Sequence, residues 1–344
     1  MKTINVTNCP VDGSPGVIYY KNINDVFFGT PGKWIYRKSE ATGHFWLDPR
    51  PNDDHIGSLY ENYYTHSAEQ SSDAGGIWQR LVEYSLSSRL GYPRPINSSL
   101  LIRILSLLPT VRGAAELEVM CVPASATGRL LDVGCGGGKF LRRMKHSGWD
   151  VTGTEPDKNA AARLSERDGF PVYSSLDELI KQIEQPFDVI VLSHVLEHVT
   201  DPIQMFAQLR SLLSDKGRII ITTPNAKSLG SMLFRQYWRG LEPPRHFNIF
   251  TLDSISQTLG ISGLTPVALR TEARLARGIW YLSYLAKMGH VDLEIKRSKN
   301  YRVLKVLGYF FQVFEAALLV IKFNLGEEIY CVAQKDLKSG GKVV

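Results

Sequence analysis

Apolar stretches alternate with amphipathic stretches along much of the chain, and this pattern predicts where its strands and helices lie. Strands are expected at residues 129–135, 150–155, 171–174, 187–192 and 218–223. Helices are expected between them, at residues 139–146, 158–168, 176–183 and 202–213. This alternation favours an α/β fold, in which a doubly wound, mostly parallel sheet has helices on both faces. Ligands of such sheets bind at the carboxyl ends of the strands.

The segments on either side of this region have different patterns. The N-terminal segment is rich in Gly, Pro, Asn and aromatic residues, which predicts a small β-rich module. A helical connector follows, with a helix that begins after residues 98–99 and ends at Pro109. Residues 275–325 are expected to form a helical insertion, and residues 328–335 a closing edge strand. The predicted parts are therefore residues 1–65, 66–127, 128–270 and 271–344.

Composition and charge exclude several classes of protein. The chain has 344 residues, of which 44% are hydrophobic and 22% charged, as in globular proteins. The formal charge is +6, but Lys and Arg are scattered among acidic residues, so no nucleic-acid partner is expected. The four cysteines are far apart, which argues against a disulfide framework and favours the cytoplasm. No secretion signal is expected at the N-terminus.

The strongest candidate for membrane contact is the apolar stretch at residues 306–321. Gln312 and Glu315 interrupt this stretch, and Lys305 and Lys322 flank it. A carboxylate inside lipid is costly, and the stretch is short for a transmembrane helix. We therefore expect a buried or interfacial helix, which is compatible with peripheral contact at the inner face of the membrane.

Candidate chemistry begins at a glycine-rich turn after the first strand of the core. Residues 132–138 read Asp-Val-Gly-Cys-Gly-Gly-Gly, and such small residues let a ligand approach the backbone closely. A dinucleotide-binding turn would have its third glycine where this chain has Lys139, which disfavours a dehydrogenase. The next strand ends at Glu155, where a carboxylate can accept hydrogen bonds from both hydroxyls of a ribose.

These motifs resemble those of class I S-adenosylmethionine (SAM)-dependent methyltransferases. The similar segments are residues 130–136, 153–156, 187–202 and 217–225, within a resemblance that covers about residues 128–260. The resemblance implies a Rossmann-like fold with SAM as cofactor. It also implies the cofactor-binding positions, which are Asp132, Gly134, Cys135 and Gly136 for the methionine part of SAM, Glu155 and Pro156 for the ribose, Ser175 and Leu176 for the adenine, and Ser193 and His194 for the reactive end.

Three histidines are candidates for a catalytic base: His246, His194 and His198. Related small-molecule methyltransferases place substrate-contacting residues after the fifth strand, where this chain has Arg245 and His246. The other interpretation of His246 is a residue that fixes its loop by hydrogen bonding.

No metal site is predicted near these histidines. Residues 194–198 match the H-x-x-E-H pattern of a zinc protease class, but no separate protease domain is evident. Ubiquinone-pathway O-methyltransferases, a similar subgroup, have an acidic residue at the position of His194 and can bind a divalent ion. The histidine at this position argues against the same ion site here.

Two segments of the N-terminal module, residues 9–13 and 39–43, have the spacing of zinc knuckles. Methyltransferases of bacterial sugar and surface-glycan pathways begin with a zinc ribbon of this kind, but only Cys9 of its four thiolates is present. We therefore expect a zinc-free remnant that packs around Trp34, Tyr36, Phe45 and Trp46. By the same resemblance, Tyr63 and Tyr64 are candidate residues of the substrate cleft.

The sequence thus predicts an enzyme that transfers a methyl group from SAM to a small molecule, with oxygen favoured as the acceptor atom. A sugar nucleotide or a lipid-linked glycan precursor of a bacterial surface-polysaccharide pathway is the expected acceptor. The alternative is a SAM-binding assembly partner that no longer transfers methyl groups. The oligomeric state stays open.

Overall fold

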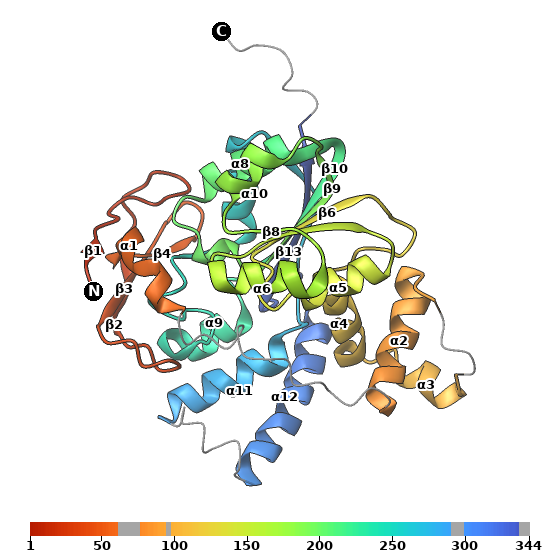
Figure 1. Ribbon diagram of the computed structural model, residues 1–344. Helices are drawn as coiled ribbons and strands as arrows, with labels where there is room; N and C mark the ends of the chain where they lie inside the picture. The colour runs from red at the N-terminus through yellow and green to blue at the C-terminus, as the bar shows by residue number, and fades with distance from the viewer. Residues whose placement is uncertain (61–75, 94–97, 290–298, 337–344) are drawn as a thin grey trace. The chain divides into compact units, whose positions relative to one another are not determined.

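The computed structural model describes residues 1–60, 76–93, 98–289 and 299–336. The chain divides into two compact units, one formed by Met1–Asn62 with Leu192–Val344, the other by Tyr63–Val191 (Figure 1). We call them the outer-sequence unit and the inner-sequence unit. The strand β9 (Phe187–Ser193) runs from the inner-sequence unit into the outer one. This division differs from the predicted boundaries because the N-terminal module and a late segment of the chain share one sheet.

The inner-sequence unit contains three helices followed by alternating strands and helices. Its helices are α2 (Ile77–Leu90), α3 (Leu100–Leu105), α4 (Pro109–Glu118), α5 (Lys139–His146), α6 (Lys158–Asp168) and α7 (Leu176–Gln182). Its strands β6 (Arg129–Val133), β7 (Asp150–Thr154) and β8 (Val172–Tyr173) pair in parallel. The predicted fold class, α/β with a Rossmann-like, mostly parallel sheet, is confirmed.

Local signals explain why the predicted elements of this unit were nearly correct. The carboxylate of Asp157 accepts hydrogen bonds from the backbone N–H groups of Asn159 and Ala160, so α6 begins where its N-cap predicts. The helix ends at Gly169, which has a left-handed φ of +63°. Leu130 and Leu131 of β6 are fully buried, as expected for a central strand.

One prediction in the helical connector was wrong. Ser99 does cap α3, since its hydroxyl accepts a hydrogen bond from the N–H of Ile102. Pro109, however, does not end that helix, which stops at Leu105. Pro109 begins α4 instead, because its fixed φ and missing N–H suit the first turn of a helix.

The outer-sequence unit contains three neighbouring antiparallel strands of the main sheet, with several helices. The strands are ordered β12 (Leu264–Glu272), β13 (Glu328–Lys335) and β10 (Leu213–Pro224). The helical elements are α1 (Asp53–Ile56), η1 (Gly57–Leu59), η3 (Leu196–His198), α8 (Pro202–Leu212), α9 (Leu229–Phe234), η4 (Arg235–Tyr237), α10 (Leu252–Ile261), α11 (Ala276–Lys287) and α12 (Lys299–Leu318). The strand β13 has the predicted bounds, but the prediction of an edge strand was wrong, because β13 pairs with β12 on one side and with β10 on the other.

The N-terminal module adds a second sheet to this unit. Its own strands are β1 (Thr3–Ile4), β2 (Val17–Ile23), β3 (Trp34–Lys38), β4 (Phe45–Leu47) and β5 (Arg50–Pro51). The short strand β11 (Asn248–Ile249) pairs with β4 and completes a sheet of the order β11-β4-β3-β2. Trp34, Tyr36 and Phe45 pack with Trp238 and Phe247 in one buried cluster. The module is therefore built together with the segment that carries His246.

Among the residues that the structure describes, no helix is long and apolar enough to cross a membrane.

Candidate active site

The glycine-rich turn between β6 and α5 has the backbone geometry of a ligand-binding loop. Gly134, Gly136 and Gly138 have φ values of +71°, +51° and +75°, a region that favours glycine. A Cβ atom on Gly153 of the neighbouring β7 would lie 2.9 Å from the sulfur of Cys135. The absence of side chains at these positions leaves the backbone of the turn accessible to a ligand.

Glu155 follows β7 and is bound to the same turn. Its Oε2 atom accepts a hydrogen bond of 2.9 Å from the N–H of Gly136, and its Oε1 atom accepts one of 3.1 Å from the N–H of Asp157. These two bonds hold the carboxylate of Glu155 beside the glycine-rich turn. Its role in ribose binding stays a prediction.

Asp132, the residue before the last of β6, has a buried carboxyl group. Burial, and then the charge of Glu155, raise the pKa of Asp132 to about 8. Two carboxyl groups near one another in a buried site favour a positively charged ligand. The amino group and sulfonium of SAM carry positive charge, so these residues fit the predicted cofactor.

We expect the affinity for SAM to depend on pH through Asp132. Below pH 8 the carboxyl group must release a proton before it can bind a cation, so affinity should rise by up to about tenfold per pH unit between pH 6 and 8. Calorimetric titration of the wild type and of Asp132→Asn tests this. The amino group of SAM titrates equally in both proteins, so equal pH profiles would contradict the expectation.

The other predicted cofactor positions of this unit lie at element ends. Ser175 caps α7, because its hydroxyl accepts a hydrogen bond from the N–H of Glu178, and Leu176 begins that helix as a buried residue. Pro156 is exposed after Glu155. Their contacts with adenine and ribose stay predictions.

Two turns of the N-terminal module have matching backbone geometry. The N–H of Cys9 donates to the carbonyl of Ser14, and the N–H of Ser39 donates to the carbonyl of His44. Gly13 and Gly43 hold the same place in each turn, with φ values of +71° and +74°. The likeness of these turns to zinc knuckles stays a prediction.

The side chains that these turns bring together form a hydrogen-bonded cluster around Asp12. Its Oδ2 atom accepts hydrogen bonds from the hydroxyls of Ser39, at 2.5 Å, and Thr42, at 3.1 Å. Burial raises the pKa of the Cys9 thiol to about 12, which disfavours the thiolate that zinc requires. One thiol, one carboxylate and two hydroxyls do not fit structural zinc, which takes thiolates and imidazoles.

We therefore expect the purified protein to contain no zinc bound at this cluster. Elemental analysis after dialysis against a chelator tests the expectation. One zinc per chain that is lost in Cys9→Ala would contradict it.

His194, which follows β9, is held between two acidic residues. It has a left-handed φ of +54°, which is uncommon for a residue with a side chain. Its Nδ1 and Nε2 atoms lie 3.0 Å from Glu197 and Glu328, respectively. Burial alone would lower the pKa of His194, but hydrogen bonds to these carboxylates raise it to about 10. His194 is thus an imidazolium at neutral pH and is unsuited to act as a base.

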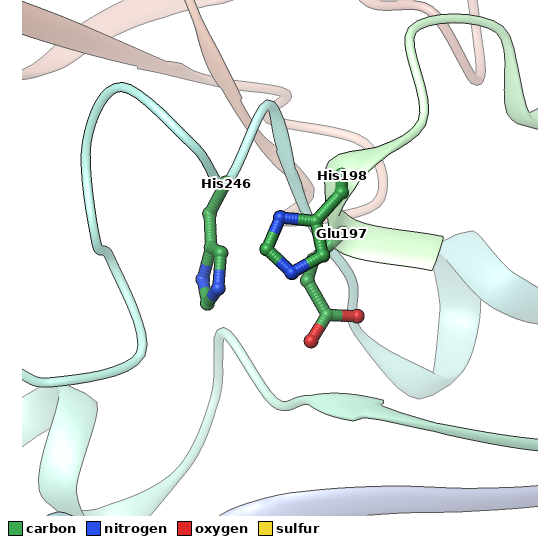
Figure 2. Close-up of side chains that lie close together, drawn as sticks. All are labelled: Glu197, His198 and His246. Carbon is green, nitrogen blue, oxygen red and sulfur yellow. The ribbon is translucent and has the colours of Figure 1, made fainter. Parts of the chain in front are cut away.

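Glu197, His198 and His246 bring one carboxylate and two imidazoles together. One ligand atom of each lies within 4.8 Å of the others. Figure 2 shows the two imidazole rings next to each other, with the carboxylate of Glu197 nearby. Glu197 and His198 come from η3, whereas His246 comes from the loop before β11. Such a set can act in acid–base catalysis or hold a divalent cation.

The hydrogen bonds of the two histidines determine which of their nitrogens is available. The Nδ1 atom of His246 lies 2.7 Å from the carbonyl of Gly240, so it carries the proton and leaves a lone pair on Nε2. The Nδ1 atom of His198 lies 3.0 Å from the carbonyl of Arg245 and 2.9 Å from the hydroxyl of Tyr60. His198 therefore has the same tautomer.

Both histidines are neutral at physiological pH. Burial, followed by the neighbouring His198, lowers the pKa of His246 well below its usual value, and burial also lowers that of His198. Burial would raise the pKa of Glu197, but its contacts with His194 lower it to about 2. The cluster thus combines an anionic carboxylate with two neutral imidazoles, of which His246 presents an unprotonated Nε2.

Arg245, a predicted substrate contact, is only 1% exposed. Its guanidinium binds Asp25 at 2.8 Å, Glu242 at 3.0 Å and the hydroxyl of Thr30 at 3.0 Å. These bonds fix the loop of His246 to the N-terminal module. They favour a positioning role for Arg245 over direct binding of an acceptor.

The remaining predicted site residues are placed as follows. Ser193 is near the hydroxyl of Thr222, with 3.4 Å between the two oxygens. Tyr63 and Tyr64 lie outside the described residues. Sequence reasoning missed Tyr60 and Glu328, which bind His198 and His194. Glu328 is 134 positions from His194, so no local pattern could have paired them.

Comparison with known proteins identifies the domain that contains most of these residues. Residues 109–269 match the model of a family described as a methyltransferase domain. This part of the chain is therefore similar to methyltransferase domains. The match supports the predicted class of enzyme.

Curated relatives of the methyltransferase domain come from ubiquinone biosynthesis. Over 189 residues, 49% of this chain, it is 28% identical to the mitochondrial ubiquinone biosynthesis O-methyltransferase of Bos taurus. Over 150 residues, 40% of this chain, it is 32% identical to the ubiquinone biosynthesis O-methyltransferase of Cereibacter sphaeroides. The chain spans 50% and 61% of the length of these relatives. They are not enzymes of sugar or polysaccharide pathways.

Among solved structures, the chain is similar to phosphoethanolamine N-methyltransferase 2 of Haemonchus contortus in complex with SAM. The two are 15% identical with a TM-score of 0.45, over 85% of this chain and 62% of the other.

Proposed function

We propose that this chain is a SAM-dependent methyltransferase that methylates an oxygen atom of a small molecule. The observation that carries the proposal is the match of residues 109–269 to a methyltransferase domain. Asp132, the turn from Gly134 to Gly136, and Glu155 would hold the cofactor. When bound, SAM supplies a methyl group on a positively charged sulfur, which is already an activated electrophile.

The residues of the histidine cluster would activate the acceptor. In this proposal the Nε2 atom of His246 takes the proton of the acceptor hydroxyl. The Nδ1–H group continues to donate its hydrogen bond to the carbonyl of Gly240, which keeps the ring oriented. The anionic Glu197 is close enough to stabilise the imidazolium that forms. A base in such a position typically contributes about 10²–10⁴-fold to the rate.

Two classes of acceptor follow from different observations. The names of the curated relatives favour a ring hydroxyl of the kind that ubiquinone biosynthesis methylates. The paired turns of the N-terminal module favour a sugar nucleotide or a lipid-linked glycan precursor, because of their likeness to the zinc ribbons of glycan-pathway enzymes. With either class of acceptor, we propose that the protein is located in the cytoplasm.

The experiment is a turnover assay that measures demethylated SAM with phenols, sugar nucleotides and lipid-linked sugars as acceptors. Turnover with any of them supports the enzyme and identifies the acceptor class. Tight SAM binding without turnover across all three classes would favour a binding protein that has lost activity. A parallel titration with NAD should show no binding, and tight NAD binding would contradict the assigned cofactor.

A further inference from the structure

The helix α12 buries two polar residues and exposes most of its large apolar residues. Gln312 and Glu315 are 3% and 0% exposed, whereas Phe310 and Phe314 are 68% and 56% exposed. Helices of globular proteins usually have the opposite arrangement, with the apolar face toward the core. The exposed face of α12 therefore needs an explanation other than folding stability.

The buried polar side chains of α12 form hydrogen bonds with other residues of the same unit. The amide of Gln312 donates a hydrogen bond of 2.9 Å to the carbonyl of Arg274 on the segment before α11. The carboxylate of Glu315 accepts hydrogen bonds from the indole N–H of Trp280, at 3.0 Å, and from the N–H of Glu327, at 2.8 Å. These bonds fix the rotation of α12 about its axis. The apolar face cannot turn inward without leaving the carboxylate unpaired.

The exposed apolar residues form one continuous stripe. Figure 1 shows α12 beside α11. Three apolar residues that follow α12, at positions 320, 321 and 323, are also exposed. Positions three and four apart lie on the same side of a helix, as they do here. We define the α12 face as the exposed residues Val303, Val306, Leu307, Phe310, Val313, Phe314, Val320, Ile321 and Phe323. Contiguous apolar patches of this kind mark interaction sites.

The charges around the α12 face have one sign. Lys305 and Lys322 are exposed on α12 and the segment after it, and Lys287 is exposed at the end of α11. Among the described residues of α11, α12 and positions 319–324, the only acidic residue is the buried Glu315. An apolar stripe flanked by cations complements a surface that has an apolar interior and anionic groups above it. A membrane that contains anionic lipids has this structure.

We propose that the α12 face is a membrane-binding surface that inserts into the interfacial region of an anionic lipid bilayer. The helix lies in the plane of the membrane, with Phe310 and Phe314 toward the acyl chains and the lysines at the headgroups. It does not cross the bilayer, since Glu315 is held by the protein interior. The proposal depends only on the α12 face and does not depend on which molecule accepts the methyl group.

The test is flotation of the full chain with phosphatidylcholine vesicles, with and without phosphatidylglycerol. A phosphatidylglycerol content of about 30% gives the vesicles a strongly anionic surface. We expect the wild type to float with the anionic vesicles and much less with the neutral ones. Phe310→Glu combined with Phe314→Glu should lower the bound fraction at least about tenfold, because carboxylates oppose both burial and the anionic surface.

A matched control distinguishes binding through the α12 face from nonspecific binding through other exposed apolar residues. Leu100 and Leu101 of α3 are also exposed, at 71% and 58%, and Leu100→Glu with Leu101→Glu should leave flotation unchanged. SAM binding should be equal in all three proteins, which keeps this test independent of the proposed function. No flotation of the wild type, or equal flotation of the Phe310/Phe314 variant, would overturn the proposal. Sedimentation provides one more contradicting outcome. If the wild type is a dimer and the Phe310/Phe314 variant is a monomer, a second copy of the chain covers the α12 face, and the proposal is overturned.

Discussion

Glu155→Ala is expected to weaken the binding of SAM by about 10²–10⁴-fold. Two hydrogen bonds from ribose hydroxyls to a carboxylate contribute about 1.5–3 kcal/mol each, and 1.4 kcal/mol corresponds to a tenfold change in affinity. The same substitution removes the acceptor for the N–H groups of Gly136 and Asp157, so the turn also loses its support. Calorimetry with SAM, and with its demethylated product, measures the effect.

Two further variants make the result interpretable. Glu155→Gln keeps one acceptor oxygen and the size of the side chain, so it should lose less affinity than alanine. Glu166→Ala removes an exposed carboxylate from α6 of the same unit and should bind SAM normally. Unchanged affinity in Glu155→Ala would refute the ribose assignment. Equal losses in Glu155→Ala and Glu166→Ala would mean that net charge, not a specific contact, determines affinity.

His246→Ala is expected to lower turnover by about 10²–10⁴-fold while the affinity for SAM stays within about twofold of the wild type. The reason is that the Nε2 lone pair is lost while the turn predicted to bind the cofactor is unchanged. Because burial lowers the pKa of His246 well below its usual value, the base is already neutral at pH 7. Wild-type turnover should therefore decline through protonation of His246 only at pH values below its ordinary pKa. Single-turnover kinetics across the pH range measure both effects.

His246→Asn distinguishes a base from a residue that only fixes its loop. The asparagine amide can donate to the carbonyl of Gly240 as Nδ1 does, but it offers no basic nitrogen. Activity restored by asparagine would mean that His246 only holds the loop. His146→Ala, at the exposed end of α5, is the matched control and should be fully active.

Metal dependence would give the same cluster a different role. A divalent cation bound to Glu197, His198 and His246 would occupy the Nε2 lone pair that the base requires. We expect turnover to survive treatment with EDTA. Loss of turnover in EDTA, restored by a divalent cation, would reassign His246 as a ligand.

The sequence by itself predicted the strands and helices of the inner-sequence unit from β6 to α7, and the class of its cofactor. The reason is that the signals are local. Asp157 caps the helix that it precedes, and Gly169 ends it. Only the helix α5 and the strand β7 lie between the turn from Asp132 to Gly138 and Glu155. Hydrophobic periodicity also gave the bounds of β13, although its antiparallel neighbours were not evident.

Only the tertiary structure decided which histidine can act as a base. The sequence favoured His246 and left His194 as an alternative, and in the structure their pKa values move in opposite directions. His194 becomes a cation because Glu328 reaches it from a strand 134 positions away. His246 stays neutral because the loop that holds it is buried against the N-terminal module, where Arg245 binds Asp25 across 220 positions. Such pairings depend on how distant segments pack, and neither spacing nor composition encodes them.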